Sequence, residues 1–172
     1  ISTFVFADNS SIRSISLPAS INKIEKWAFQ NCTGLEAVYI TDLAAWCEIE
    51  FESNPLTLAN ALYLNGELLT ELKVPHGVKT ISTNAFYQYT RLTSVSIPSS
   101  VKAIGNNAFY GCTSLKSVDL PDGVATIDLA AFYGCYSLES VNLPANAATV
   151  GDAAANHYIM TPTGAMRQCW LS

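Results

Sequence analysis

Residues 98–120 read PSSVKAIGNNAFYGCTSLKSVDL, and residues 121–143 read PDGVATIDLAAFYGCYSLESVNL. The two stretches share a leading proline, a valine, an isoleucine, the string Ala-Phe-Tyr-Gly-Cys and a closing Leu-x-x-Val-x-Leu, all at an offset of 23 residues. A fixed period of this length means that each unit is one supersecondary element, which buries its apolar face by stacking on its neighbours. The repeat therefore predicts a solenoid.

The same apolar skeleton recurs outside these two coils. Its aromatic column contains Phe29, Phe86, Phe109 and Phe132, and its cysteine column contains Cys32, Cys112 and Cys135, with Tyr89 as the one departure. We expect the phenylalanines to form a spine inside the solenoid. We expect the cysteines to be a ladder of small buried thiols, because side chains in one column point in parallel and do not converge as a disulfide requires.

Within one coil, the pattern predicts a short extended segment at Val101 and Ile104, then a turn, and one strand at the end. Val118 and Leu120 alternate with polar neighbours at the end of the coil, which indicates a half-buried strand. Asn106-Asn107 can cap a single helical turn that carries Ala108 and Phe109. One strand per coil predicts one parallel sheet along one side of the solenoid, with short helical turns elsewhere.

We assign residues 1–172 to a single domain, and the 23-residue period divides this domain into coils. We assign a partial coil to 1–17, regular coils to 18–40, 75–97, 98–120 and 121–143, a long variant coil to 41–74, and a degenerate coil with a C-terminal tail to 144–172. The chain starts inside a repeat, whereas terminal repeats need a polar outer face. We therefore expect further protein upstream of Ile1.

The variant coil differs from the others in length and pattern. Thr41-Asp42 supplies a helix start, and the apolar pattern predicts about two helical turns that end near Phe51. Asn54-Pro55 is expected to stop this helix. Asn65-Gly66 lies between two apolar runs, which predicts a hairpin with a type I′ turn. We expect the coil to bulge from the regular rod.

Composition excludes several classes of protein. The chain has 172 residues and a net charge of −5, and its Lys and Arg residues do not cluster. Nucleic acid is therefore not an expected partner, because phosphates need a basic patch. No apolar run approaches the roughly 20 residues of a membrane-spanning helix, so we expect no transmembrane segment in this stretch.

The sequence offers no catalytic constellation. Its two histidines, His76 and His157, do not lie at metal-ligand spacing from another His or Cys, and Cys47 has no histidine partner nearby in the sequence. His76 follows a strand-ending proline at a coil corner, where we expect it to be solvated. We predict that the chain is not an enzyme and that it holds no cofactor and no metal.

The skeleton resembles one known family. The string Ile97-Pro98-x-x-Val101-x-x-Ile104-Gly105-x-x-Ala108-Phe109-x-Gly111-Cys112-x-x-Leu115-x-x-Val118 and its copies are similar to the BspA-like leucine-rich repeats of bacterial and protist cell-surface proteins. The resemblance implies a leucine-rich repeat solenoid, which we expect to be right-handed. It also implies a secreted or cell-surface location and adhesion to host proteins or other cells.

One feature of the regular coils has the properties of a partner site. Tyr87, Tyr110 and Tyr133 each follow the buried phenylalanine by one residue, so they should stack as a half-exposed column that Tyr136 extends sideways. We expect an extracellular protein-interaction or adhesion module that contacts a host or cell-surface protein there. The alternatives are a glycan-binding module, which would need exposed aromatics to stack on sugar rings, and a rigid spacer without a ligand. The tyrosines would then only shield the coil edge.

Overall fold

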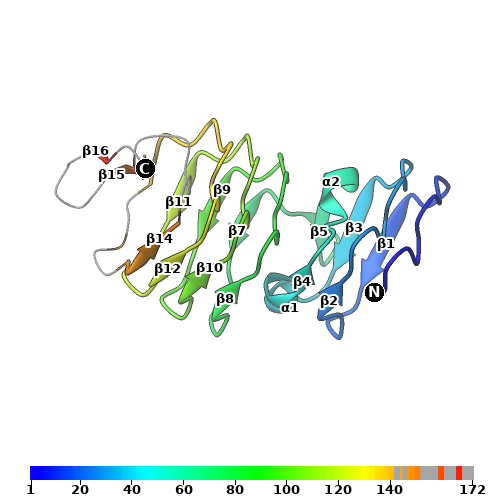
Figure 1. The fold of residues 1–172 in the computed structure, drawn as a ribbon, viewed down its shortest axis with the longest axis horizontal. Coiled ribbons are helices and arrows are strands. Elements are labelled where there is room, and N and C mark those ends of the chain that lie inside the picture. Colours follow the sequence, from blue (N-terminus) through cyan, green and yellow to red (C-terminus); the bar gives the residue numbers. More distant parts are fainter. Residues whose placement is uncertain (142–143, 145–146, 152–158, 161–165, 168–172) are drawn as a thin grey trace.

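The computed structural model describes residues 1–141, 144, 147–151, 159–160 and 166–167. Successive coils stack along one axis, and the N-terminus lies at one end of the stack (Figure 1). The chain is a β-solenoid of short parallel strands with little helix. The predicted solenoid and its 23-residue period are confirmed, because the paired strands of neighbouring regular coils are offset by 23 residues, as in Ser94↔Ser117↔Ser140.

The first strand ladder is the predicted parallel sheet. It consists of β1 (Ser14–Leu17), β3 (Ala37–Ile40) and β5 (Leu62–Leu64), and, as a separate sheet, β7 (Glu71–Lys73), β9 (Ser94–Ser96), β11 (Ser117–Asp119) and β13 (Ser140–Val141). Side chains alternate as the sequence pattern predicts. Val118 is buried in β11, whereas Ser117 and Asp119 are exposed.

A second strand ladder corrects the prediction of one strand per coil. It consists of β2 (Lys23–Ile24) and β4 (Glu50–Phe51), and of β8 (Thr80–Ile81), β10 (Ala103–Ile104), β12 (Thr126–Ile127) and β14 (Thr149–Val150). Each of these strands has two residues, and the buried isoleucine column supplies the inward one, as with Ile104. Such a segment is too short for periodicity to show, but stacking at 23 residues lets its backbone bond to both neighbours.

The third side of each coil consists of turns, and the predicted helical turn is not formed. Asn107 and Gly111 have φ angles of 54° and 69°, which lie in the left-handed region. The N–H of Phe109 donates to the carbonyl of Ala131 in the next coil, at 2.8 Å, whereas the N–H of Ala108 bonds back to Gly105 within the turn. Because alternate N–H groups reach the next coil, this side is also cross-linked along the solenoid.

The core contains the predicted aromatic spine, with one substitution. Phe86 and Phe109 stack at 5.4 Å between ring centroids, and Phe109 and Phe132 stack at 5.2 Å. In the variant coil, Trp46 supplies the ring next to Phe86, at 6.4 Å and an interplanar angle of 52°. The tilted indole of Trp46 therefore continues the spine from Phe86 into the variant coil.

The cysteine column is confirmed as a buried ladder of free thiols. Cys32, Cys47, Cys112 and Cys135 are buried and unbridged. The thiol of Cys112 donates to the Phe86 carbonyl at 3.2 Å, and that of Cys135 to the Phe109 carbonyl at 3.1 Å. Each thiol therefore bonds to the coil before its own, which leaves neighbouring sulfurs parallel. Cys169 lies outside the described residues.

The variant coil contains the expected helix and hairpin, but the helix is shorter than predicted. Helix α1 spans Leu43–Glu48, and its N-cap Asp42 accepts from the Ala45 N–H at 3.0 Å. It ends before Phe51 because Glu50–Phe51 form strand β4 against β2. Pro55 stands at the N-cap of a second helix, α2 (Leu56–Ala59).

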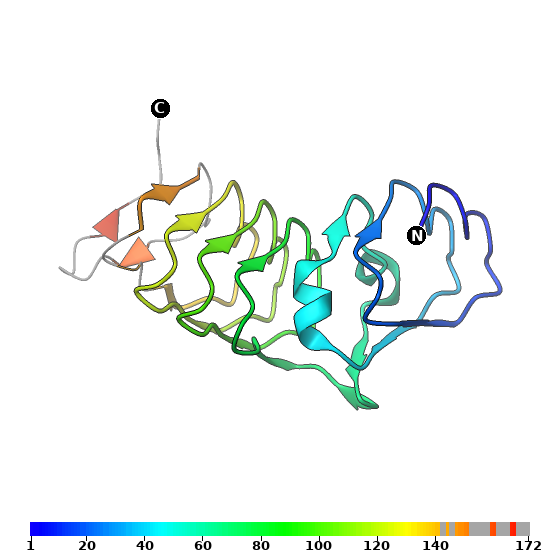
Figure 2. The ribbon, with the colours of Figure 1, turned by 90° about the horizontal axis from the view of Figure 1, so that it is seen from below.

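The hairpin of the variant coil is confirmed. Strand β6 (Glu67–Leu68) pairs antiparallel with β5 across Asn65-Gly66. The φ angles of Asn65 and Gly66 are 51° and 88°, as a type I′ turn requires. In Figure 2, a segment coloured between cyan and green reaches beyond the loops of the regular coils, so the variant coil does bulge.

Both strand ladders are interrupted at the variant coil. The order β1-β3-β5-β6 is separate from β13-β11-β9-β7, and β2-β4 is separate from β14-β12-β10-β8. We call this interruption the seam. Side chains bridge it: the indole N–H of Trp46 donates to the Ala85 carbonyl at 3.1 Å, and the Asn54 amide donates to the carbonyls of Asn84 and Ala85 at 2.7 and 3.0 Å.

After Pro144 the second ladder continues for one more coil. Strand β14 pairs with β12 in register, Thr126↔Thr149 and Ile127↔Val150. Two further strands, β15 (Ile159–Met160) and β16 (Met166–Arg167), pair antiparallel. Most of the predicted tail, including Ala155 and Trp170, lies outside the described residues.

Candidate functional site

The three predicted site residues form a stacked tyrosine column on the turn side of the coils. Tyr87 and Tyr110 lie 5.0 Å apart between ring centroids at 16°, and Tyr110 and Tyr133 lie 5.2 Å apart at 15°. All three are half-buried. The turn that places Phe109 inside directs the next residue toward solvent, and the 23-residue period repeats this arrangement.

Stacking covers the ring faces but leaves the hydroxyl groups without protein partners among the described residues. Burial, and to a smaller extent the neighbouring Tyr110, raises the pKa of Tyr87. The column is therefore a preordered strip of aromatic edges and hydroxyl groups. Such groups make van der Waals contacts and hydrogen bonds.

A hollow of about 390 Å³ lies beside the tyrosine column, and sequence reasoning did not predict it. Its lining residues are Leu56, Thr57, Asn60, Gln88, Thr90, Tyr110, Gly111, Thr113, Tyr133, Gly134 and Tyr136. The hollow thus lies between helix α2 of the variant coil and the three regular coils 75–97, 98–120 and 121–143. Tyr87 does not line it, whereas Tyr136, which is 66% exposed, does.

Two glycines create the floor of this hollow. Positions 8, 31, 88, 111 and 134 share one column, and all five have positive φ angles. In the first two coils the column carries side chains, and the Asn31 amide donates to the Asp8 carboxylate at 2.7 Å. Gly111 and Gly134 leave the corresponding space empty, and a Cβ added at Gly134 would lie 3.3 Å from the Gly111 Cα. The repeated Gly at offset 23 was the available sequence signal.

One wall of the hollow is fixed by hydrogen bonds across the seam. The Asn60 amide donates to the Thr90 hydroxyl at 2.8 Å and accepts from the Thr90 N–H at 3.1 Å. The Asn60 carbonyl also accepts from Arg91 Nε at 2.7 Å. These bonds hold α2 against the coil of Tyr87, so the hollow is preformed.

The outer face of the strands has a different character. In the groove over β7, β9 and β11, Ser94, Ser96 and Ser117 lie with Glu71, Lys73 and Asp119. Toward the N-terminus, Tyr39 stacks on Tyr63 at 4.9 Å between centroids. Away from this pair, the outward side chains in the groove carry small hydroxyl or charged groups.

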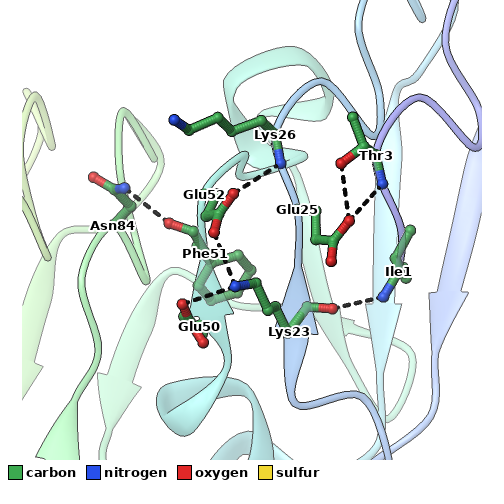
Figure 3. A network of polar contacts seen from close by, with 9 residues as sticks. All are labelled: Ile1, Thr3, Lys23, Glu25, Lys26, Glu50, Phe51, Glu52 and Asn84. Atoms are coloured by element: carbon green, nitrogen blue, oxygen red, sulfur yellow. Dashed lines mark hydrogen bonds and ion pairs between the residues drawn. The ribbon is translucent and has the colours of Figure 1, made fainter.

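A polar network at the second ladder is structural. Lys23 lies between Glu50 and Glu52, at 3.1 and 2.9 Å, and Glu25 accepts from Thr3 (Figure 3). The hydrogen bonds that Lys23 donates to Glu52 and Glu50 raise the pKa of Lys23, and the bond to Glu52 lowers the pKa of that carboxyl group. One ammonium group on β2 thus contacts two carboxylates of the β4 segment, and the network ties β4 to β2.

Among the described residues, no three His, Cys, Asp or Glu side chains are placed to hold a metal ion. Burial raises the pKa of the Cys47 thiol to about 12, so the thiol is not a nucleophile at neutral pH. His76 is exposed, as expected for a coil corner, and His157 lies outside the described residues. No helix in the described part is long and apolar enough to cross a bilayer.

Stacked parallel strands with a 23-residue period and little helix define a leucine-rich-repeat type of solenoid. A family model described as the BspA type leucine rich repeat region matches residues 1–51 and 56–160, with six copies. The chain therefore belongs to the BspA-type leucine-rich repeat family, a surface-associated family with a generally non-catalytic repeat. No curated protein matches the chain at a significant level.

Solved structures of bacterial proteins resemble this chain. A leucine rich cell surface protein from Faecalibacterium prausnitzii is 29% identical with a TM-score of 0.55, over 83% of this chain and 39% of that one. A leucine-rich repeat protein from T. pallidum is 26% identical with a TM-score of 0.50, over 89% and 66%. The pneumococcal vaccine antigen PcpA, 18% identical with a TM-score of 0.56 over 84% and 48%, shares the fold. The chain thus spans less than two thirds of each.

Proposed function

We propose that this chain is a non-catalytic, extracellular interaction module that mediates adhesion to a protein on a host or another cell. The observation that carries the proposal is the tyrosine column, in which three half-buried rings stack over consecutive coils. Membership of a surface-associated repeat family and similarity to a cell surface protein support the location.

The physical argument rests on the low entropic cost of binding to this column. A tyrosine offers a large contact area with few rotatable bonds. Here each ring is already immobilised by its neighbours, so a partner need not order it. The hydroxyl groups of Tyr87, Tyr110 and Tyr133 remain available, which lets one strip make both apolar contacts and hydrogen bonds.

The test replaces the three tyrosines together. We expect the triple variant Tyr87→Ser, Tyr110→Ser, Tyr133→Ser to lose most adhesion of protein-coated beads to a panel of immobilised extracellular-matrix proteins. The matched control is Tyr39→Ser, which removes an exposed stacked tyrosine from the strand face. Circular dichroism and a thermal melt establish whether each variant is folded.

Two outcomes would contradict the proposal. A folded triple variant that adheres at full strength would show that the column only shields the coil edge. If the wild-type chain adheres neither to a protein of the panel nor to a cell surface, the result would favour a rigid spacer without a ligand. If the triple variant unfolds, the single variant Tyr87→Ser takes its place in the adhesion test, because it leaves Tyr110 and Tyr133 stacked.

A further inference from the structure

We propose that the hollow beside the tyrosine column binds an uncharged sugar ring of a glycan. This site goes beyond the adhesion proposed above, because it uses the floor and the walls of the hollow. Its ligand is recognised without Tyr87, which stacks on Tyr110 outside the lining. The two proposals can therefore fail separately.

The chemistry of the lining selects the ligand class. None of the lining residues carries a charge at neutral pH, and their polar groups are hydroxyls and amides. An anionic ligand would find no cation there, and the chain as a whole carries a net charge of −5. Hydroxyls and amides complement the hydroxyl groups of a neutral sugar, in which each oxygen both donates and accepts.

Aromatic rings supply the apolar contact that a sugar ring needs. Both faces of Tyr110 are covered by the neighbouring tyrosines, so it offers its edge and hydroxyl. Tyr136 is in no stacked pair among the described residues, and it is 66% exposed. Its ring face is therefore available to lie against the C–H groups of a sugar at one side of the hollow.

The floor disfavours an extended peptide as the occupant. A peptide added to a sheet edge needs free backbone N–H and C=O groups. Here the N–H of Gly111 already donates to the Tyr133 carbonyl at 2.7 Å, and the N–H of Gln88 donates to the Tyr110 carbonyl at 2.7 Å. Hydrogen bonds must instead come from side chains such as Thr113 and Gln88, which have no partner among the described residues.

The size of the hollow matches a single sugar unit. Small-molecule sites usually span about 300–1,000 Å³, and this one has about 390 Å³. The bare glycine floor provides this space, because a side chain at position 111 would fill it as Asn31 does in its own coil. A shallow site of this size is expected to bind one ring weakly and to gain strength from repeated glycan units.

The experiment is a saturation-transfer NMR titration of the 172-residue chain. The probes are the methyl glycosides of glucose, galactose, mannose and N-acetylglucosamine, with methyl glucuronide and N-acetylneuraminic acid as charged sugars. We expect saturation transfer to at least one neutral glycoside and at least tenfold weaker transfer to both acids. Gly111→Asn, Thr113→Val and Tyr136→Ser should each weaken the neutral signal at least fivefold.

Matched controls separate this site from other effects. Gly66→Asn makes the same change at another positive-φ glycine, in the hairpin turn, and should leave the signal unchanged. Tyr87→Ser should reduce protein adhesion and leave sugar binding intact. Asn tolerates the left-handed region, and Gly111→Asn should therefore fold. If it does not, the exposed positions Thr113 and Tyr136 still provide the test.

Three results would overturn the proposal. The first is no saturation transfer to any of the four neutral glycosides. The second is equal transfer to neutral and acidic sugars, which would mean that the lining does not select by charge. The third is full sugar binding by the folded Thr113→Val and Tyr136→Ser variants, which would place the ligand elsewhere on the chain.

Discussion

Tyr89 shows how one residue adapts the repeat to its neighbour. In the regular coils the cysteine at this position donates to the preceding coil, as Cys112 does to Phe86. The coil before Tyr89 is the variant coil, and there the phenol hydroxyl bonds to the hairpin. It donates to the Leu69 carbonyl at 2.6 Å and accepts from the Leu62 N–H at 3.3 Å.

We expect Tyr89→Phe to destabilise the chain by about 1–3 kcal/mol, because it leaves two buried polar groups at the base of the hairpin without partners. Urea unfolding followed by circular dichroism measures the change. Tyr87→Phe removes a hydroxyl that has no partner among the described residues, and it should change the free energy of unfolding by less than about 0.5 kcal/mol. Equal stability of the two variants would mean that the hydroxyl of Tyr89 does not hold the hairpin.

At the scale of elements, the variant coil replaces backbone ladders with side chains. Helix α1 provides Trp46 to the spine, and the segment after β4 provides Asn54. Asn54 is 5% exposed, so its amide lies inside the protein. Its amide donates to two carbonyls beyond the seam, while its Oδ1 accepts from the Leu56 N–H at 2.8 Å. The Asn54 side chain therefore bonds both to the start of α2 and to the coil beyond the seam.

We expect Asn54→Ala to lower the free energy of unfolding by about 1–3 kcal/mol, since the buried N–H of Leu56 loses its acceptor and the carbonyls of Asn84 and Ala85 each lose one of their donors. Stability in a repeat protein is a sum over units and their interfaces, so a weakened seam should also separate the halves. Hydrogen exchange should then show that the amides of residues 1–51 and those of residues 75–141 exchange at different rates. Asn22→Ala, at an exposed position, is the control. Unchanged stability and uniform exchange in Asn54→Ala would contradict a joining role.

Over the whole molecule, backbone hydrogen bonds link neighbouring regular coils on three sides of the stack, and side chains bridge the seam. One cluster of buried residues lies inside. Burial in this core changes the pKa values of several side chains. Burial raises the pKa of Cys47 to about 12 and holds the pKa of Cys112 well above its usual value. Burial also raises the pKa of Tyr89. These groups stay protonated in the folded chain at pH values where the unfolded chain releases their protons.

We therefore expect stability to fall as the pH rises above about 8.5, the pKa of an unperturbed thiol. In this range the unfolded state binds fewer protons than the folded state, so alkali favours unfolding. Each buried thiol contributes a loss of up to about 1.4 kcal/mol per pH unit. Urea unfolding at pH 7.5 and 9.5, both chosen to bracket about pH 8.5, measures the slope.

The matched variants are Cys47→Ala and Cys112→Ala, each of which should make the slope shallower. Thiol titration of the denatured chain without reductant should detect Cys112 and Cys135 as free groups. A slope that neither alanine variant alters would mean that these thiols ionise in the folded chain. Mass spectrometry that finds a Cys112–Cys135 bridge would contradict the parallel arrangement of the column.

Much of the architecture follows from the period alone. Residues 23 positions apart occupy equivalent places in regular coils, so the Phe86–Phe109–Phe132 spine and the thiol ladder could be predicted without coordinates. The same reasoning predicted the stacking of Tyr87, Tyr110 and Tyr133. The Asn65-Gly66 hairpin was predictable because a type I′ turn depends on local backbone preferences.

Other features depend on atoms that the period does not relate. The second ladder rests on two-residue strands such as Ala103–Ile104, which are stable only because the preceding coil accepts their hydrogen bonds and the following coil donates to them. Helix α1 stops early because Glu50 and Phe51 pair with a strand from the previous coil. The hollow exists because two glycines lack side chains opposite a wall that the seam holds in place. Contacts between an irregular coil and its neighbours do not follow the 23-residue period. The sequence pattern therefore does not predict them, and they are set only in the folded chain.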